Sequence, residues 1–314
     1  MRPTNATQGL KAIRLQPDTW IQRVIRAASR GPLHLVLIAI ALLWTFPSVG
    51  LLVSSFRPKL NVATSGWWTA FQLPFEFTLE NYAFVLFRRG VGDSFVSSIL
   101  ITVPATFLTI LVASFAAFAF AWMSFRLRDF LFFFVIALLV VPLQMTLIPL
   151  LNLLGFFKLN ATYLGIWLVH MGFGLPFAVF LLRNFFAALP REMLEASQVD
   201  GASSRVVFFK IVLPLSTPAL ASLAIFMFLW IWNDLLVALI FLGGSPELVP
   251  GILPPVSADR GPLTLTIASL VSSRGADWEL LTAAAFVSML LPLVVFFALQ
   301  RYFVRGLLTG GLRG

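Results

Sequence analysis

Residues 189 to 219 read LPREMLEASQVDGASSRVVFFKIVLPLSTPA, a polar segment that lies between two long apolar stretches. Pro190 suits the first position of a helix, because its missing N–H costs nothing there. Arg191 and Glu195 have the i, i+4 spacing of an ion pair on one helix face. The pattern predicts a short helix that ends at about Val199.

The next residues predict a sharp turn and a second helix. Asp200-Gly201 is a turn dipeptide, and its glycine can adopt the left-handed conformation that ends many helices. Ser203 or Ser204 can then cap the following helix. We therefore expect two short helices joined by a glycine elbow, inside an otherwise apolar chain.

The composition of the whole chain indicates an integral membrane protein. Of its 314 residues, 59% are hydrophobic and 11% are charged, and the mean hydropathy is +0.94. These values exclude an ordinary soluble domain. A helix needs about 20 apolar residues to cross the hydrocarbon core. We expect an all-α protein with six membrane spans, at about 33–55, 95–122, 130–151, 162–182, 216–242 and 280–300.

The distribution of charge predicts which side each loop faces. The net charge is +9, with 22 Lys and Arg residues. With both termini and the 183–215 loop in the cytoplasm, 15 of these 22 lie inside and seven lie outside. This is the positive-inside bias of membrane proteins. It also accounts for the basic net charge, so nucleic acid is not an expected partner.

Three parts are expected along the chain. Residues 1–32 form a basic cytoplasmic segment, in which 18–30 is either an amphipathic helix on the lipid surface or part of a disordered tail. If 18–30 is an amphipathic helix on the lipid surface, the chain is expected to turn into the first span at Gly31-Pro32. Residues 33–300 form the membrane domain, and residues 301–314 form a cytoplasmic tail.

Two long segments are expected on the outer side. Residues 56–94 are too polar to span, so they are predicted to form an extracytoplasmic loop with Trp67 and Trp68 at the membrane interface. Residues 243–279 contain many Gly and Pro residues, which exclude a long helix. A loop of that length without regular structure usually has a binding role.

Several kinds of chemistry are excluded. No GxxxxGK[ST] phosphate loop occurs, so this chain cannot hydrolyse ATP by the P-loop route. Cysteine is absent, which excludes disulfides and cysteine metal ligands. The two histidines, His34 and His170, are far apart, and no HExxH motif occurs. No metal and no cofactor is therefore expected in this chain.

A few polar residues lie in the predicted spans. Asp234, next to Asn233, is the only acidic one, and a charge at membrane depth faces a bundle interior or an aqueous cavity. It either lines the translocation pathway or holds helices together by hydrogen bonds. The same alternatives apply to four further residues in or at the ends of spans, Gln144, Asn152, His170 and Asn184.

The inner loop resembles a known motif. Glu195-Ala196, Asp200-Gly201 and then Ile211-Val212-Leu213-Pro214-Leu215 resemble the EAA loop of ABC importer permeases. One departure is Ser197, where the family commonly has a second alanine, but serine is small enough for the same packing. The resemblance implies that residues 189–214 dock on a cytoplasmic ATPase, through Glu195, Ala196, Asp200, Gly201, Leu213 and Pro214.

The C-terminal residues 300–314, QRYFVRGLLTGGLRG, resemble the end of MalG-type permeases of carbohydrate ABC importers. SSFRP, FTLENY, VPLQMTLIPL and WNDLLVALIFL match the same family in order along the chain, and VPLQMTLIPL with GIWLVHMGFGLPFAVFLLRNFF is most similar to its alpha-glucoside branch. The resemblance implies a type I importer permease of the MetI-like fold in the inner membrane. It also implies tail contacts with the ATPase at Arg301, Arg305, Gly306 and Gly310.

The same resemblance implies a set of partners. This chain and a second homologous permease would form the translocation pathway, and two ABC ATPase copies would use ATP and Mg²⁺. An extracytoplasmic sugar-binding protein would meet the 243–279 loop. The chain itself would be a non-catalytic subunit, in contact with membrane lipid, for uptake of maltose-like or alpha-glucoside sugars.

Other functions remain open from the residues alone. The chain could be the permease of an importer for another solute. A secondary transporter is expected to carry several acids at discontinuous helices, whereas only Asp234 lies in a span. A channel is expected to show a ring of polar or charged residues, and a membrane enzyme needs a nucleophile, a base and an orienting group that converge. The sequence shows neither pattern.

Overall fold

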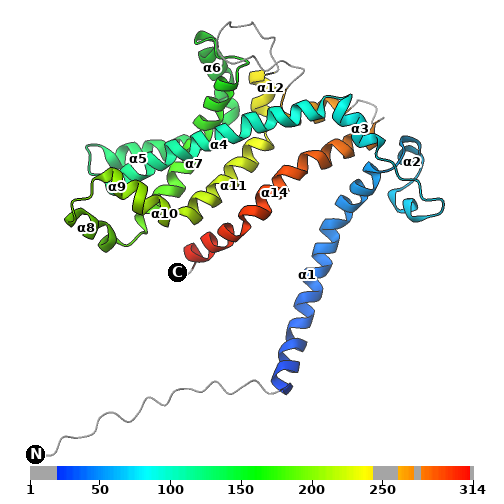
Figure 1. The fold of residues 1–314 in the computed structure, drawn as a ribbon, viewed down its shortest axis with the longest axis horizontal. Coiled ribbons are helices and arrows are strands. Elements are labelled where there is room, and N and C mark those ends of the chain that lie inside the picture. The colour runs from blue at the N-terminus through cyan, green and yellow to red at the C-terminus, as the bar shows by residue number, and fades with distance from the viewer. Residues whose placement is uncertain (1–19, 243–260, 272–276, 312–314) are drawn as a thin grey trace, which may run out of the picture. The chain divides into compact units, whose positions relative to one another are not determined.

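The computed structural model describes residues 20–242, 261–271 and 277–311. Every regular element in these ranges is a helix, which confirms the predicted all-α class (Figure 1). The chain divides into two compact units, residues 1–51 and 52–314. The first unit contains most of α1, and the second contains all the other helices.

α1 (Trp20–Ser55) is one unbroken helix. Its apolar part, Gly31–Ser55, is long enough to cross a membrane, as predicted. The expected turn at Gly31-Pro32 is wrong, because the helix continues through Pro32. A proline removes a single N–H donor, and membrane helices tolerate that loss. Residues 1–19 of the predicted basic segment lie outside the described residues.

Four of the six predicted spans are single long helices. They are Gly31–Ser55 in α1, α4 (Val91–Trp122), α7 (Tyr163–Ala187) and the first part of α14 (Trp278–Gly311). α14 continues beyond the predicted end of its span, so residues 301–311 of the predicted tail are helical.

The third predicted span is a bent pair of helices. α5 (Arg128–Ala137), extended by the 3-10 turn η2 (Leu138–Val140), meets α6 (Leu143–Phe156) at 105°. The break lies at Val141-Pro142, where Val141 has φ −72° and ψ 118°. Proline disfavours helical backbone at the residue before it, so the chain turns here.

The segment around the fifth predicted span bends at Ser216 and breaks again after α11 (Thr217–Trp232). The bend is 73°. Pro218 lacks the N–H that would reach the Pro214 carbonyl, and the Thr217 hydroxyl donates to that carbonyl instead at 2.8 Å. α12 (Leu236–Leu242) begins after three non-helical residues. With each bent pair counted as one span, the described residues contain up to six spans.

α4 and α7 pack side by side and form the centre of the second unit (Figure 1). Ala113 and Ala117 of α4 and Ala178 of α7 are fully buried. Such small residues let two membrane helices approach closely. Trp122 and Trp167 donate hydrogen bonds across the pair to main-chain carbonyls, at 3.1 and 2.9 Å. α11 packs on both helices and on α14.

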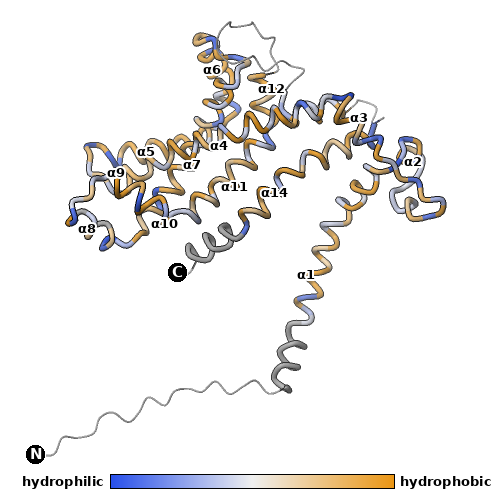
Figure 2. The backbone as a smooth tube through the Cα atoms, in the orientation of Figure 1, coloured by the Kyte–Doolittle hydropathy of each residue, from blue (hydrophilic) through white to orange (hydrophobic). Residues whose placement is uncertain are grey.

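Short helices lie near the ends of the long ones. They are α2 (Lys59–Thr64), the 3-10 helix η1 (Trp67–Phe71), α3 (Glu80–Phe87), α8 (Arg191–Val199) and α13 (Leu263–Leu270). In Figure 1, α3 lies at one end of α4 and α8 lies beyond the other. Figure 2 shows hydrophilic residues near these two ends and mostly hydrophobic residues between them. The two ends correspond to the predicted outer and inner loops.

Candidate coupling elbow

The inner loop folds as two short helices around a turn. α8 ends where Gly201 adopts φ +78°, a left-handed conformation that costs glycine little. The Ala202 N–H donates to the Ser197 carbonyl at 3.0 Å and closes the end of the helix. α9 (Ser204–Val207) follows. The predicted pair of helices and its glycine elbow are confirmed.

Two details of the predicted elbow differ in the structure. Ser203 precedes α9 with extended backbone, but its side chain makes no capping hydrogen bond. Arg191 and Glu195 are both exposed, and no salt bridge between described residues joins them. Exposed ions stay well hydrated apart, so helical spacing alone gains little from pairing them. The Glu195 carboxylate is therefore free to meet a partner.

The elbow exposes apolar side chains as well as acids. Val199 is 88% exposed and Met193 is 46% exposed. An apolar surface on a protruding element gains from burial against a partner. Val199 and Met193 are not among the residues predicted to dock, and the four predicted ones on this part of the elbow are exposed too: Glu195, Ala196, Asp200 and Gly201.

The segment after α9 is anchored in the core of the second unit. Phe208 and Val212, 3% and 0% exposed, lie on the π-helical turn η3 (Phe208–Val212). The Phe208 ring stacks on Phe115 of α4, with 4.9 Å between centroids, and lies 5.1 Å from the ring of Phe118. Aromatic pairs at this separation add directional packing to apolar burial.

This anchor connects the elbow to several spans at once. Phe208 and Val212 belong to one buried cluster with residues of α4, α7 and α11. α10 (Leu213–Leu215) continues from the anchor, with Leu213 half-buried and Pro214 exposed. Close-packed side chains have little free volume and therefore transmit displacement. A push on the elbow would move these helices together.

Sequence reasoning on the inner loop missed this anchor. Phe208 and Val212 are four residues apart in the run VVFFKIV. Apolar residues at that spacing indicate one buried helix face. The signal was present, but the neighbouring Phe209 and Ile211 are apolar too and obscure which face is buried.

The polar residues predicted in the spans do not come together. His170 is 1% exposed on α7, with its ring 5.8 Å from that of Trp230. Asn233 donates to a carbonyl of α11 at 2.7 Å and lines a groove of about 250 Å³ between α11 and α14. Three others are exposed at separate places: Gln144, Asn152 and Asn184.

Asp234 lies at the break between α11 and α12. Its carboxylate accepts the N–H of Ala238 at 3.2 Å, and its carbonyl accepts the hydroxyl of Thr264 on α13 at 2.7 Å. These bonds cap α12 and hold α13 beside it. The geometry favours the helix-packing role of the two roles that the sequence left open.

Two predicted contact regions are described only in part. The predicted tail contacts lie on the helical end of α14, and their side chains are outside the described residues: Arg301, Arg305, Gly306 and Gly310. In the 243–279 loop, residues 243–260 and 272–276 are also outside the described residues. One short helix, α13, lies in the described part of this loop. Its shortness agrees with the prediction that the many Gly and Pro residues exclude a long helix.

Membrane helices packed around α4 and α7, with an exposed elbow anchored among them, are the organisation of a permease subunit. Residues 109–309 match the family described as binding-protein-dependent transport system inner membrane component, and the chain belongs to this family. The match includes the elbow, α7, α11 and the spanning part of α14. The predicted membership of the ABC importer permeases is confirmed.

Individual relatives agree with this assignment. The chain is 51% identical to the osmoprotective compounds uptake permease protein GgtD of Synechocystis sp., over 90% of this chain and 92% of the relative. It is 42% identical to the alpha-glucoside transport system permease protein AglG of Rhizobium meliloti, over 91% of this chain and 98% of the relative.

A solved structure shows the same fold. It is that of a bacterial ABC transporter involved in the import of the acidic polysaccharide alginate. The TM-score is 0.69 at 20% identity, over 91% of this chain and 99% of the other. The predicted importer-permease fold is confirmed.

Proposed function

We propose that this chain is a membrane-spanning subunit of an ATP-driven uptake system for a sugar of the alpha-glucoside type. The family and the fold support an importer permease. The substrate class is supported by the relative named for alpha-glucosides, which is 42% identical. The relative named for osmoprotective compounds, 51% identical, supports a small osmoprotective solute as the second candidate.

One observation carries the coupling part of this proposal. α8 leaves Val199 and Met193 exposed, 88% and 46%, while the residues that follow are buried between α4, α7 and α11. A docking element needs both properties, a bare surface for the partner and a firm connection to the part that moves. We therefore assign the 189–214 loop as the ATPase dock.

The partners supply what this chain lacks. Its sequence has no P-loop, so a separate pair of ABC ATPases uses ATP and Mg²⁺ in this proposal. A second homologous permease completes the translocation pathway, and an extracytoplasmic binding protein delivers the solute. The helical end of α14, with Arg301 and Arg305, makes a second contact with the ATPases.

We place the chain in the inner membrane with the elbow and both termini in the cytoplasm. The 15 to 7 division of basic residues supports this orientation. The sequence contains no cysteine, so one introduced cysteine reports one position. Ser203→Cys should react with a membrane-impermeant maleimide only from the cytoplasmic side, and Gln72→Cys only from outside. Labelling of Ser203→Cys from outside would contradict the orientation.

The coupling role is tested at Gly201, with Gly90 as a matched control. The two glycines have φ +78° and +72°, and a Cβ on either would meet no atom within 4 Å. A side chain therefore imposes similar backbone strain at both, about 1–2 kcal/mol, but only Gly201 lies on the elbow. In the reconstituted complex, Gly201→Asp should abolish uptake and the stimulation of ATP hydrolysis by the binding protein. Gly90→Asp should retain both.

A second substitution separates charge from bulk. Asparagine has the shape of aspartate without its charge and likewise tolerates the left-handed conformation, so Gly201→Asn retains the shape of the elbow and adds only a neutral side chain. Loss of coupling with Asn indicates that the ATPase approaches the Gly201 backbone closely. Normal uptake and normal stimulation in Gly201→Asp would mean that the loop is only a connector. The solute is identified separately, by measuring which compounds bind the cognate binding protein.

A further inference from the structure

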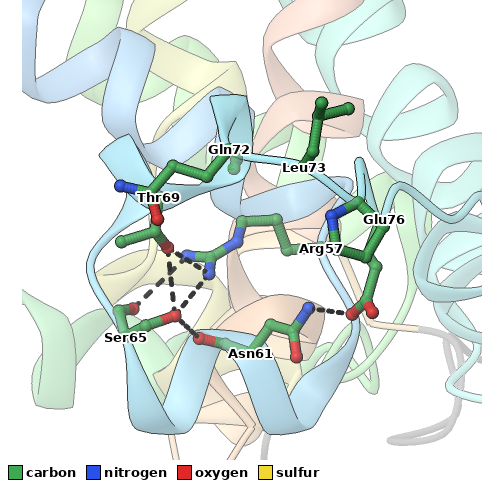
Figure 3. A pocket seen from close by; sticks show the side chains of 9 residues that line it. Arg57, Asn61, Ser65, Thr69, Gln72, Leu73 and Glu76 are labelled. Atoms are coloured by element: carbon green, nitrogen blue, oxygen red, sulfur yellow. Dashed lines mark hydrogen bonds between the residues drawn. The ribbon is translucent and has the colours of Figure 1, made fainter.

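Residues 56–79, here called the outer cap, have a polar interior organised by one arginine. Arg57 is only 3% exposed. Its Nη1 donates to the carbonyls of Ser65 and Gly66 at 3.3 and 3.0 Å, and its Nη2 donates to the hydroxyls of Ser65 and Thr69 at 2.6 and 3.1 Å. Figure 3 shows the guanidinium of Arg57 beside Ser65 and Thr69. The cap folds around a buried cation.

The two ends of the outer cap are also joined by polar contacts. The Thr78 N–H donates to the Phe56 carbonyl at 2.7 Å. Asn81 lies just after the cap. Its side-chain amide donates to the carbonyls of Ser55 and Arg57, at the start of the cap, both at 2.9 Å. In Figure 3, Asn61 donates to Glu76 across the polar cleft. The cap thus satisfies many of its hydrogen-bonding groups internally.

The outer surface of the cap is apolar. Leu73, at the edge of the polar cleft, is 81% exposed (Figure 3). Seven large apolar residues of the cap are exposed in total: Leu60, Trp68, Phe71, Leu73, Phe75, Phe77 and Leu79.

Few charges interrupt this apolar surface. Besides Arg57, the cap contains two charged residues, Lys59 and Glu76. Lys59 pairs with Asp277 at 2.6 Å, and Glu76 accepts the hydrogen bond from Asn61. Each charge in the cap therefore has a partner within the chain.

This arrangement is the reverse of that in a water-exposed loop, which presents its polar groups and covers its apolar ones. Apolar surroundings favour the arrangement of the cap, with polar groups inside and apolar side chains outside. Backbone groups in such surroundings must find hydrogen-bond partners inside the segment. A binding protein that arrives and leaves would expose these side chains to water between encounters. Lipid covers them continuously.

The position of the cap agrees with a lipid contact. The cap begins directly after Ser55, the last residue of the first span, and leads through α3 to the outer end of α4. It is therefore close to the headgroup region of the bilayer, where Trp and other amphipathic residues are enriched. Phe87, at the end of α3, is a further exposed apolar residue on this side, at 82% exposure.

We propose that the outer cap lies in the outer leaflet, with Phe75 and Phe77 among the acyl chains and the polar cleft toward water. The partner is the lipid bilayer itself. The assignment to the outer leaflet rests on the proposed orientation, and the lipid contact is independent of the solute and of the coupling elbow. The cap acts as an anchor that sets the depth of the outer ends of α3 and α4.

Spin labels on single cysteines test the proposal in the complete complex, reconstituted in bilayers. Phe75→Cys and Phe77→Cys are the lipid-facing positions, since neither residue lines the cleft, and Gln72→Cys is the control that does. All three are exposed, so the label should not disturb packing. We expect the labels at 75 and 77 to collide several-fold more with oxygen, which concentrates in lipid, than with a water-soluble nickel chelate. The label at 72 should show the opposite.

Two other outcomes would overturn the proposal. Nickel collisions at 75 and 77 equal to those at 72 would place the apolar surface in water. Low collision rates with both reagents at 75 and 77 would show that protein covers it, either the second permease or the binding protein. Phe71→Cys, at another exposed residue of the cap, gives an independent reading if one of the labelled variants fails to assemble.

Discussion

The coupling elbow and the outer cap are both loops that protrude from the ends of membrane helices, but they are held in different ways. The elbow is anchored through Phe208 and Val212, which are buried among three long helices. The cap is held by its own hydrogen bonds around Arg57. The first arrangement ties the loop to the spans, and the second makes the loop self-contained.

The difference has a mechanical consequence. Displacement passes through dense apolar packing, so motion of the elbow should reach α4, α7 and α11. Local hydrogen bonds hold the cap together without requiring the spans to move. We therefore expect damage to the elbow anchor to impair transport, and damage to the cap to remain local.

The largest effect is expected from Phe208→Ala. Truncation of a buried phenylalanine costs about 3–5 kcal/mol and leaves a cavity, here between the elbow and α4. The melting temperature of the complex and its solute uptake should both fall sharply. Phe209→Ala is the matched control, because Phe209 is the next residue and is 55% exposed. Equal losses in the two variants would contradict the assignment of the anchor.

A smaller and more local effect is expected from Arg57→Gln. The shorter amide cannot serve all four acceptors, and each buried polar group left without a partner costs about 1–3 kcal/mol. The cap should loosen, so that a cysteine placed at Ala70, which is 7% exposed, becomes reactive from outside. Coupled ATP hydrolysis per assembled complex should stay normal. Arg88→Gln, at an exposed arginine on the same side, should leave Ala70→Cys protected.

Glu195→Ala should weaken ATPase binding without disturbing this chain, because Glu195 forms no salt bridge among the described residues. An ion pair at the rim of an interface contributes about 1–2 kcal/mol and is screened by salt. The affinity of the ATPase, measured by titration at low ionic strength, should fall about tenfold. At high salt the variant and the wild type should converge. A loss that is independent of salt would show that Glu195 does not act through its charge.

The elbow was predictable because its signals are local. Asp200-Gly201 and the apolar spacing before it lie within one short stretch, and turn chemistry acts over neighbouring residues. The same applies to the spans, since length and hydropathy suffice to identify them. Pro142 also gave a local signal for the break in the third span, but the apolar run on both sides hid it.

The cap was predictable only as a polar outer segment. Its structure depends on contacts between Arg57 and residues 8 to 12 positions later, and no local pattern specifies which acceptors a long side chain reaches. The role of Asp234 has the same difficulty. Its carbonyl meets Thr264, 30 residues away, so the helix-packing contact follows from the tertiary fold.

The smallest effect concerns an ion pair between the cap and Asp277, the residue before α14. Lys59 Nζ lies 2.6 Å from Asp277 Oδ1, and Arg89 Nη2 lies 3.7 Å from Asp277 Oδ2. The hydrogen bond from Lys59 lowers the pKa of Asp277, and the same bond raises the pKa of Lys59. Because Lys59 is largely exposed, water and salt weaken the pair, and its contribution to stability should be small.

The pH dependence of this ion pair tests how independent the cap is. The lowered pKa of Asp277 means that its contribution is complete above the ordinary aspartate value, about 4, and is lost as the pH falls through the folded-state pKa. The raised pKa of Lys59 means that its contribution is complete below about 10 and is lost at higher pH. Asp277→Asn should therefore lower the melting temperature slightly at pH 7, and the difference should shrink as the pH falls below about 4 and through the lowered pKa of Asp277. Adding Lys59→Gln to Asp277→Asn should not lower the melting temperature further at pH 7, since Lys59 has already lost its ion-pair partner. A large decrease, or a difference that persists in acid, would mean that α14 supports the cap by more than this pair.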